Sequence, residues 1–368
     1  MNRQIIKILR TLPAVILLVS ISSVMLMVLS RHVKIEVTSL NEISIPTDET
    51  EVPPLIITAF PRTKYTKTIP TIPIETTTLG NATVKPRVLF DEIINPHPYR
   101  YKRIPSRVCK STGNQVHPRL LILVKSNVFQ IGHRMAIRAT WGNFTNSSIQ
   151  IAFLLGDSPL ITSFTKMEYD LYEDMVQEDF MDEYKNNTLK TIMGFNWAVS
   201  DCSQAKFVLF VDDDYYVNIP LLLDLIENIT ESEDENVFIG FKYEHAVVRR
   251  KKESKWYVST DEYPNKHWPP YISGGSMLLS MDVVKEISKT FPHVKQIFID
   301  DVYLGIVAEI LNITLTHDKR FEVKYVPEKL DTLITSHDYG SPNVLVHEWN
   351  IDDDEDDAIS TVEQNSRT

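Results

Sequence analysis

The strongest constraint on the fold of this chain is a series of almost continuous apolar runs that alternate with helical patterns. Residues 119–126 read RLLILVKS, residues 149–157 read IQIAFLLGD and residues 206–212 read KFVLFVD. Unbroken runs of Leu, Ile, Val and Phe are typical of strands that are buried on both faces, and strands separated by helices favour a mostly parallel sheet. We therefore expect one α/β domain over residues 106–350.

The N-terminus has the pattern of a membrane anchor. Residues 11–30, TLPAVILLVSISSVMLMVLS, contain no charged side chain and have about the length that a helix needs to cross a bilayer. Residues 1–10 include Arg3, Lys7 and Arg10, so the positive-inside rule predicts a cytoplasmic N-terminus and a lumenal body. A cleaved signal peptide is the alternative, but its apolar region is usually shorter and ends in small residues. We expect an uncleaved signal-anchor of a single-pass type II membrane protein.

Two segments that flank the α/β domain have compositions that do not support a packed core. Residues 31–105 are rich in Pro and Thr without a sustained strand or helix period, which favours a lumenal stem. Residues 351–368 carry the run DDDEDD and are expected to form an acidic, disordered tail. N-glycosylation triplets are modestly enriched, which favours a lumenal body. They begin at Asn81, Asn143, Asn146, Asn186, Asn228 and Asn312.

Charge and cysteine content exclude several classes of protein. A formal net charge of −11 argues against nucleic acid as a partner, because phosphate binding uses clustered Lys and Arg. The basic run RRKKESK at residues 249–255 is short and interrupted, as in a solvated loop. Neither GxGxxG nor a P-loop occurs. Cys109 and Cys202 leave two alternatives, one disulfide in an oxidising lumen or two buried thiols.

Three adjacent carboxylates, Asp212, Asp213 and Asp214, follow the apolar run at 206–211. Ligand sites of parallel sheets lie at the carboxyl ends of the strands, and side chains at i and i+2 of an extended chain point to the same side. Asp212 and Asp214 are therefore suited to share one hard divalent cation such as Mg²⁺ or Mn²⁺. The alternative is a solvated acidic turn before a helix.

A second acidic pair, Asp300 and Asp301, stands at the start of a helical pattern within QIFIDDVYLGIVAEIL. Such residues are commonly stabilised by the helix dipole, which is the structural alternative. A carboxylate at this position is also able to act as a general base toward a bound hydroxyl.

Taken together, these residues resemble the β1,3-galactosyltransferase and β1,3-N-acetylglucosaminyltransferase family. The matching segments stand in family order between Pro118 and Trp349. They read RMAIRATWG (134–142), FLLG (153–156), EYDLYEDMVQEDFMDEYKNNTLKT (168–191), FVDDDYYVN (210–218), KWYVSTDEYPNKHWPPYISGGSMLLS (255–280) and IDDVYLG (299–305). The resemblance implies a GT-A fold, with a Rossmann-like mixed sheet flanked by helices, in an inverting Golgi membrane enzyme.

The resemblance also implies a metal and nucleotide site. The DxD motif of the family matches Asp212, Asp213 and Asp214, which would bind Mn²⁺ and the diphosphate and ribose of a UDP-sugar, with Asp214 as the direct ligand. The segment SHDYGSPNVLVHEWN resembles the closing His…Pro…Trp segment of the family and suggests His337 as a third metal ligand. Its rivals are His317 and His347.

Further residues are expected around the nucleotide. Arg134 and Arg138 match residues that help to build the nucleotide pocket of the family, although their i, i+4 spacing also suits surface charges on a helix. Lys190 lies in a donor-side segment, and its alternative is a solvated helix lysine. Gly274 and Gly275 would let the backbone approach the donor closely, or mark a turn.

On the acceptor side, the resemblance places Asp301 in the position of the catalytic base, with Asp300 beside it. Trp256, Trp268 and Tyr271 carry aromatic faces that suit stacking on a sugar, while a role in the hydrophobic core is the alternative for each. The expected reaction is a single inverting displacement in which Asp301 removes the proton of the acceptor 3-hydroxyl. No covalent sugar-enzyme intermediate is required.

The donor and the acceptor stay open. Tyr215 and Tyr216 stand where many galactosyltransferases carry Val-Phe, and this form is similar to the Brainiac-like glycolipid branch, which transfers N-acetylglucosamine. The donor is therefore galactose or an N-acetylhexosamine on UDP, and the acceptor a glycolipid or a glycoprotein. The alternatives from other classes are a metal-dependent phosphoesterase and a membrane-anchored, Ca²⁺-dependent carbohydrate-binding or adhesion protein.

Overall fold

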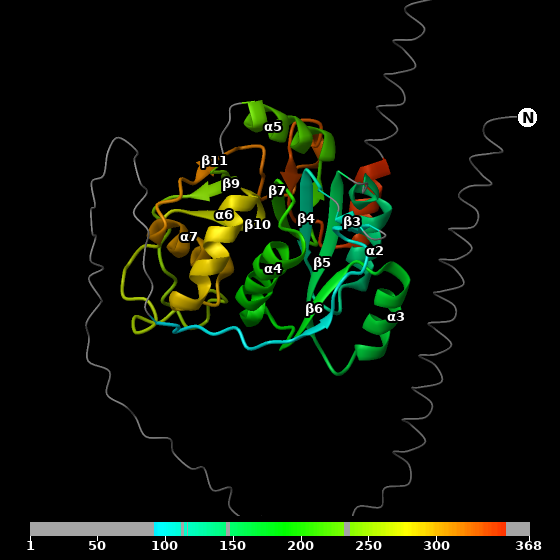
Figure 1. Cartoon of the computed structure of the whole chain (residues 1–368). Helices are drawn as coiled ribbons and strands as arrows, with labels where there is room; N and C mark the ends of the chain where they lie inside the picture. The colour runs from blue at the N-terminus through cyan, green and yellow to red at the C-terminus, as the bar shows by residue number, and fades with distance from the viewer. Residues whose placement is uncertain (1–91, 112–113, 116, 145–147, 232–235, 351–368) are drawn as a thin grey trace, which may run out of the picture. The chain divides into compact units, whose positions relative to one another are not determined.

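The described part of the protein covers most of the expected α/β domain and the last residues of the expected stem. The computed structural model describes residues 92–111, 114–115, 117–144, 148–231 and 236–350 (Figure 1). The expected cytoplasmic segment, signal-anchor and acidic tail, most of the stem, and Asn81 and Asn146 lie outside these residues. Within the described ranges, no helix is long and apolar enough to span a membrane.

An eight-stranded sheet organises the domain, in the order β1-β6-β5-β4-β7-β10-β9-β11. Its strands are β1 (Tyr101–Arg103), β4 (Leu120–Lys125), β5 (Ile149–Asp157), β6 (Met175–Met181), β7 (Phe207–Asp212), β9 (Phe238–Tyr243), β10 (Tyr271–Ser280) and β11 (Thr316–His317). β4, β5, β6 and β7 are parallel neighbours, as the apolar runs predict. β10 is antiparallel to β7 and β9, and β1 is antiparallel to β6, so the sheet is mixed.

The remaining strands form two small ladders. They pair β2 (Lys110–Ser111) with β3 (Asn114–Gln115), and β8 (Tyr216–Val217) with β12 (Thr335–Ser336). The α-helices are α2 (Ile131–Ala139), α3 (Thr162–Tyr172), α4 (Asn187–Asp201), α5 (Ile219–Glu231), α6 (Met281–Thr290) and α7 (Asp300–Ile310). Short 3₁₀ turns occupy Trp141–Phe144, Tyr184–Asn186, Phe291–His293 and Pro327–Lys329.

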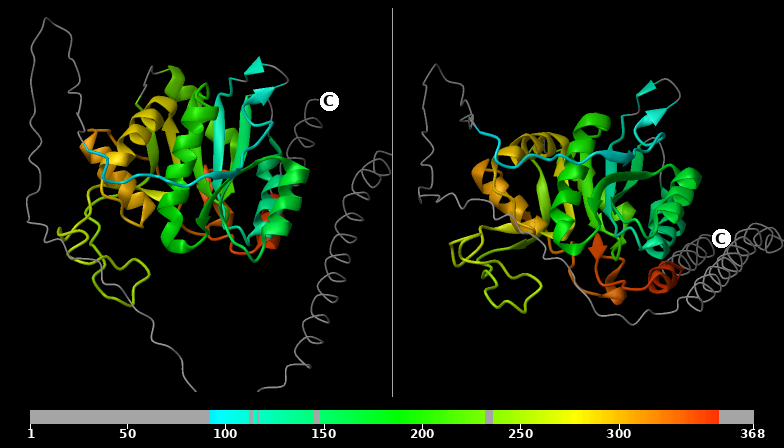
Figure 2. Two further views of the ribbon diagram at one scale, coloured as in Figure 1. Left: turned by 60° about the horizontal axis from the view of Figure 1, so that its bottom comes forward. Right: turned by 90° about the horizontal axis from the view of Figure 1, so that it is seen from below.

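Two hydrophobic cores cover the two faces of the sheet, because every residue of β4 is buried and alternate side chains point to opposite sides. Leu121 and Leu123 belong to the core that contains the apolar faces of α4, α6 and α7. Leu120, Ile122 and Val124 belong to the core that contains those of α2 and α5. Figures 1 and 2 show α4, α6 and α7 grouped along one side of the sheet. The expected α/β architecture is therefore confirmed.

The folded domain begins earlier than the sequence indicated. Residues 92–105, which we assigned to the stem, pack on the domain: the Ile94 and Asn95 amides both donate to the Pro292 carbonyl at 2.9 Å, and β1 extends the sheet beside β6. A disulfide between Cys109 and Cys202 ties the chain just after residues 92–105 to the C-terminal end of α4. Of the two alternatives for the cysteines, the structure has the bridge.

Candidate active site

The acidic triplet lies at the carboxyl edge of the parallel strands, where sheets of this class place their ligands. In the register between β4 and β7, Lys125 pairs with Asp212, so the last residues of the two strands lie side by side. The Asp213 amide donates to the Lys125 carbonyl at 3.1 Å and continues the pairing by one residue. Asp212 thus ends a central strand, and Asp213 and Asp214 form the turn that follows it.

Lys125 joins the two acidic motifs. Its Nζ lies 3.0 Å from Oδ1 of Asp212 and 2.8 Å from Oδ2 of Asp300, and its side chain is only 2% exposed. Thr191 also donates to Oδ2 of Asp300, at 2.8 Å. Burial raises the pKa of the Asp300 carboxyl, but the charge and hydrogen bond of Lys125 and the bond from Thr191 outweigh it, so this pKa lies below its ordinary value. Asp300 is thus held as a carboxylate.

Asp301 has a different environment in the first turn of α7. Its Oδ1 accepts from the Val302 amide at 2.7 Å and its Oδ2 from the Gly274 amide at 3.3 Å. Burial, followed by the negative charge of Asp300, raises the pKa of the Asp301 carboxyl to about 7 despite these two bonds. A carboxyl that titrates near neutral pH is suited to general-base chemistry.

His337 reaches the triplet from a distant part of the chain. Its Nε2 lies 3.3 Å from Oδ2 of Asp214, and the Tyr339 amide donates to the Asp214 carbonyl at 3.0 Å, which fixes this C-terminal segment on the triplet. The rival histidines have other partners: Nδ1 of His317, on β11, accepts from the Lys242 amide of β9, and His347 lies beside Glu348. Among the three candidates, the structure brings only His337 to the triplet.

The donor atoms at this position suit a divalent cation, although no set of three or more His, Cys, Asp or Glu residues is already assembled as a metal cage in the described part of the chain. Asp214 and His337 are in contact, and Asp212 shares an ion pair with Lys125 through Oδ1. Burial raises the pKa of Asp212 to about 6, with the charges of Asp214 and Asp300 adding to the effect and Lys125 opposing it. A cation would relieve this repulsion, and carboxylate oxygen with imidazole nitrogen fits Mn²⁺. The metal stays a prediction.

The loop after β4 is held by two buried cations, Arg134 and Lys190. Arg134 is fully buried: Nε and Nη2 bind Glu168 at 2.8 and 2.7 Å, and Nη1 donates to Ser126 Oγ and to the Asn127 carbonyl. Ser126 Oγ in turn donates to Asp213 at 2.6 Å. Arg134 therefore stabilises the loop after β4, whose Ser126 holds Asp213, and contact with a nucleotide stays a prediction.

Lys190 and Arg138 are also engaged within the protein. Lys190 Nζ donates to the Ser126 carbonyl at 2.5 Å and to Oδ1 of Asp182 at 2.8 Å. Arg138 forms a two-pronged ion pair with Asp174 at 2.8 Å for both bonds. The solvated alternatives for these residues are wrong, because Lys190 is buried and Arg138 nearly so. Lys190 also borders the pocket described next.

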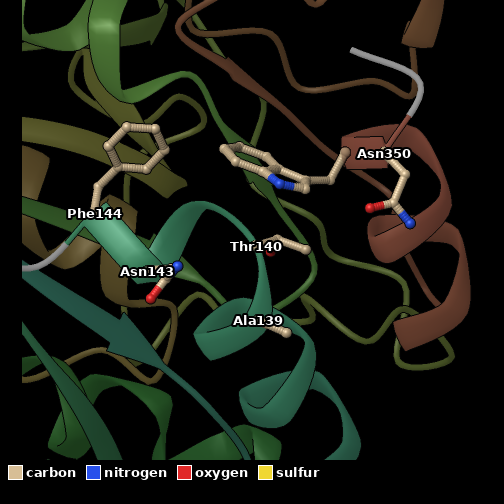
Figure 3. Close-up of a pocket in the computed structure, with 6 residues that line it drawn as sticks. Ala139, Thr140, Asn143, Phe144 and Asn350 are labelled. Carbon is tan, nitrogen blue, oxygen red and sulfur yellow. The ribbon is translucent and has the colours of Figure 1, made fainter. Parts of the chain in front are cut away.

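A pocket of about 230 Å³ opens beside the triplet. Its lining comes from the ends of β4 and β7, from the residues that directly follow these strands, and from the segment between Asp182 and Lys190. The lining residues are Lys125, Ser126, Asn127, Asp182, Glu183, Tyr184, Asn187, Lys190, Asp212, Asp213 and Asp214. A larger pocket of about 380 Å³ lies between Thr140, Phe144 and Trp349 (Figure 3). That second pocket is lined by no acid, base or nucleophile of the kind that the chemistry requires, so the smaller one is the candidate site.

Two glycines of β10 make room for the site. A Cβ on Gly275 would overlap the ring and hydroxyl of Tyr215, and a Cβ on Gly274 would lie 3.1 Å from Cβ of Asp301. Both residues are within a strand, so the turn alternative is wrong. Their missing side chains let Tyr215 and Asp301 approach the strand closely, and an approach to the donor stays a prediction.

The aromatic candidates separate by burial. Trp268 is 6% exposed and its ring centroid lies 4.3 Å from that of Tyr263, which is the core role that the sequence left open. Trp256 is 42% exposed, and Tyr271 is half-buried with its ring stacked on Tyr243 at 5.2 Å. Trp256 and Tyr271 thus keep faces that are able to meet a sugar.

Of the described sequon residues, Asn143, Asn228 and Asn312 are exposed and Asn186 is half-buried. Asn143 borders the larger pocket in Figure 3. Exposure is what glycosylation needs, and the modification itself stays a prediction.

Sequence reasoning missed Lys125 and Tyr184. A lysine at the end of an apolar run was visible in RLLILVKS, and the meeting of parallel strand ends at one edge is the signal that would have selected it. Tyr184 carried no such signal, because it reaches the pocket only through the fold.

Comparison with known proteins connects this geometry to a family. The family model described as galactosyltransferase matches residues 132–319. The chain is 36% identical over 260 residues to beta-1,3-galactosyltransferase brn of Drosophila melanogaster, covering 68% of this chain and 79% of that protein. It is 31% identical over 302 residues to beta-1,3-galactosyltransferase 1 of Mus musculus, covering 79% and 89%. A solved glycosyltransferase involved in glycosylation of the PBCV-1 major capsid aligns with a TM-score of 0.36 at 15% identity, covering 63% and 99%.

Proposed function

Since the chain belongs to the galactosyltransferase family, we infer that it is a β1,3-glycosyltransferase that moves galactose or an N-acetylhexosamine from a UDP-sugar to the 3-hydroxyl of a glycan. The observation that carries this proposal is the Lys125 bridge, which holds the DxD carboxylate Asp212 and the helix of Asp301 at one edge of the sheet. The relatives are named as transferases, and neither the adhesion protein nor the phosphoesterase gains support.

In the proposed reaction, the acceptor oxygen attacks the anomeric carbon of the donor from the face opposite UDP. The bond between the anomeric carbon and the diphosphate oxygen breaks and its electron pair leaves with UDP. The Asp301 carboxylate takes the proton of the acceptor hydroxyl, and the configuration inverts. The raised pKa of Asp301, about 7, makes this carboxylate a stronger base than an ordinary aspartate.

The residues that would hold Mn²⁺ are Asp212, Asp214 and His337. When bound, the ion would supply positive charge that stabilises the departing diphosphate. Lys125 holds Asp212 in place, and Ser126, which accepts a hydrogen bond from Arg134, donates to Asp213. We expect the diphosphate to occupy the pocket of about 230 Å³ beside these side chains.

We further propose a GT-A fold and a Golgi location with the domain in the lumen. The disulfide between Cys109 and Cys202 supports an oxidising compartment. The uncharged stretch at residues 11–30 and the exposed sequons support a type II membrane topology with glycosylation.

The donor sugar and acceptor class are the finer part of the proposal. The names of the relatives favour galactose, whereas the Tyr215-Tyr216 pair is similar to the branch that transfers N-acetylglucosamine. A transfer assay decides the function: UDP-galactose, UDP-N-acetylglucosamine and UDP-N-acetylgalactosamine are offered with a panel of glycosides and Mn²⁺, and the product linkage is determined. A β1,3-linked product supports the proposal. Hydrolysis of a phosphoester without transfer, or thermal stabilisation by Ca²⁺ but not by UDP with Mn²⁺, would contradict it.

A further inference from the structure

The connection between β9 and β10, residues 244–270, is an ordered extension of the site. The guanidinium of Arg250 donates to the carbonyls of Val258, Tyr263 and Asn265 at 2.8, 2.7 and 2.7 Å. Val258 and Trp268 pack in a hydrophobic cluster of their own, beside residues that lead into α7. Figure 2 shows this connection, in yellow-green, projecting from the end of the sheet that carries β9 and β10. Its shape is therefore determined by internal contacts.

Both ends of this connection lie close to Asp301. Tyr243 and Tyr271, which end β9 and begin β10, stack on each other. The start of β10 packs on the first turns of α7: a Cβ on Gly305, one turn after Asp301, would lie 2.5 Å from Cβ of Tyr271, and the Gly274 amide donates to Oδ2 of Asp301 at 3.3 Å. The Val258 amide donates to the Arg249 carbonyl at 3.1 Å, so Arg249 belongs to the ordered part of the connection, and its side chain is exposed.

The middle of the connection returns to the pocket. Lys255 Nζ lies 4.5 Å from the ring centroid of Trp256 and 5.6 Å from that of Tyr184. Tyr184 lines the pocket beside the triplet and is 54% exposed. Tyr184, Lys255 and Trp256 thus form an aromatic and cationic rim at the mouth of the site.

The basic run of this connection contains one cation that bonds within the loop and several that form no ion pair in the described residues. Arg250 is used internally, whereas Arg249, Lys251, Lys252 and Lys255 are exposed and form no ion pair with any acid in the described residues. The domain as a whole is acidic, and the adjoining cleft is lined by carboxylates. An unpaired basic stretch beside an acidic cleft would attract an anion that approaches from the acceptor side.

We propose that Arg249 and Lys255 recognise an acidic group, a carboxylate, sulfate or phosphate, on the acceptor glycan. The proposal rests on the transferase function above and names the acceptor class of the same site. The sugar that carries the attacking hydroxyl lies at Asp301, its apolar face meets Tyr271 or Trp256, and the acidic group of the same or the next residue lies against the two cations. The diphosphate of the donor is the competing anion, and the experiment separates the two.

The experiment compares neutral acceptors with their acidic counterparts on the full-length enzyme. The probes are p-nitrophenyl β-galactoside and β-N-acetylglucosaminide, each with its sulfated form, assayed with the active UDP-sugar. Exposed ion pairs are weak, so the two cations predict a preference in kcat/KM of about two- to thirtyfold for the sulfated form, which corresponds to about 0.4–2 kcal/mol. The preference should fall toward unity in about 1 M NaCl, where the Debye length is about 3 Å.

The variants Lys255→Gln and Arg249→Gln should reduce the ratio of sulfated to neutral kcat/KM while the KM for UDP-sugar stays constant. Lys206→Gln is the matched control, because Lys206 is exposed at the opposite end of β7 and should leave the ratio unchanged. Binding of the sulfated and neutral glycosides to the UDP-loaded protein, measured by calorimetry, gives the same comparison without turnover.

Equal use and equal binding of the two acceptor forms would overturn the proposal and leave the transferase function intact. A rise in the KM for UDP-sugar in the Lys255→Gln and Arg249→Gln variants, with an unchanged acceptor ratio, would assign the cations to the diphosphate instead. Absence of transfer from every UDP-sugar to any acceptor would remove the proposed function and this inference with it.

Discussion

The Lys125 ammonium lies 2.8 Å from the Asp300 carboxylate, and both side chains are buried. The same ammonium contacts Asp212 on the neighbouring strand. One cation thus joins the motif proposed to bind the donor to the helix that carries the proposed base. Lys125 and Asp300 are removed from water, whereas the Asp212 side chain is 35% exposed, so the buried pair depends most on the bridge.

Replacing Lys125 by Met should destabilise the fold by about 3–5 kcal/mol, because it leaves Asp300 buried without its counter-ion. Urea denaturation of the folded domain measures the change. The double variant Lys125→Met with Asp300→Leu should recover part of the loss. Lys206→Met, at an exposed position, is the control. An unaltered free energy of unfolding in Lys125→Met would show that the bridge does not hold the site together.

Asp301→Asn should lower kcat by about 10²–10⁴-fold, the usual contribution of a general base. UDP affinity should stay the same, since Asn keeps an oxygen that is able to accept from the Val302 or Gly274 amide. Steady-state kinetics and calorimetric titration with UDP measure the two effects. Asp331→Asn, at an exposed position, is the control. Near-normal transfer by Asp301→Asn would remove this residue from the role of base.

The pH profile should report the same group. The pKa of Asp301 is raised to about 7, so below that pH the carboxyl is protonated and unable to accept the proton of the acceptor. We expect kcat/KM to fall about tenfold per pH unit on the acid side of about 7 and to level off above it. Residual activity of Asp301→Asn should lack this acid limb. A limb that persists unchanged in the variant would belong to another group.

Asp214→Ala and His337→Ala should each weaken Mn²⁺-dependent UDP binding by about tenfold or more, since even the partners of metal ligands contribute 10–100-fold. UDP binding measured in EDTA should differ little from that of the unmodified protein. His347→Ala, a histidine far from the triplet, is the matched control. If His337→Ala retains the full effect of Mn²⁺, then the ligand set is Asp212 and Asp214 without the imidazole.

Gly275→Ala should destabilise the domain by about 1–3 kcal/mol, the usual cost of overpacking a core. Its new methyl group would overlap Tyr215, whose hydroxyl is the nearest atom. Combining it with Tyr215→Phe should relieve part of the clash. Thermal unfolding of the two single variants and the double variant forms the cycle, and strictly additive effects would show that the two residues do not press on each other.

The sequence by itself determined the class of fold and the chemistry of the strand ends. Apolar runs buried on both faces require a sheet covered by helices on both sides, and polar residues that directly follow such runs must emerge at an edge. Asp212, Asp300 and Asp301 could therefore be selected from local pattern, because hydrophobic burial along a strand depends on the residues of that strand. The resemblance of the six ordered segments then indicated the family, which the comparisons confirm.

Only the tertiary structure decided which of these residues meet. Lys125 lies between Asp212 and Asp300 because β4 is in register with β7 while α7 packs against β10. The same long-range packing brings His337 to Asp214, pairs Cys109 with Cys202, buries Trp268 while Trp256 stays exposed, and surrounds Arg134 with carboxylate and carbonyl acceptors. Burial and charge from distant residues likewise raise the pKa of Asp301. These properties depend on separations in space, which residues far apart in the chain acquire only after the core has formed.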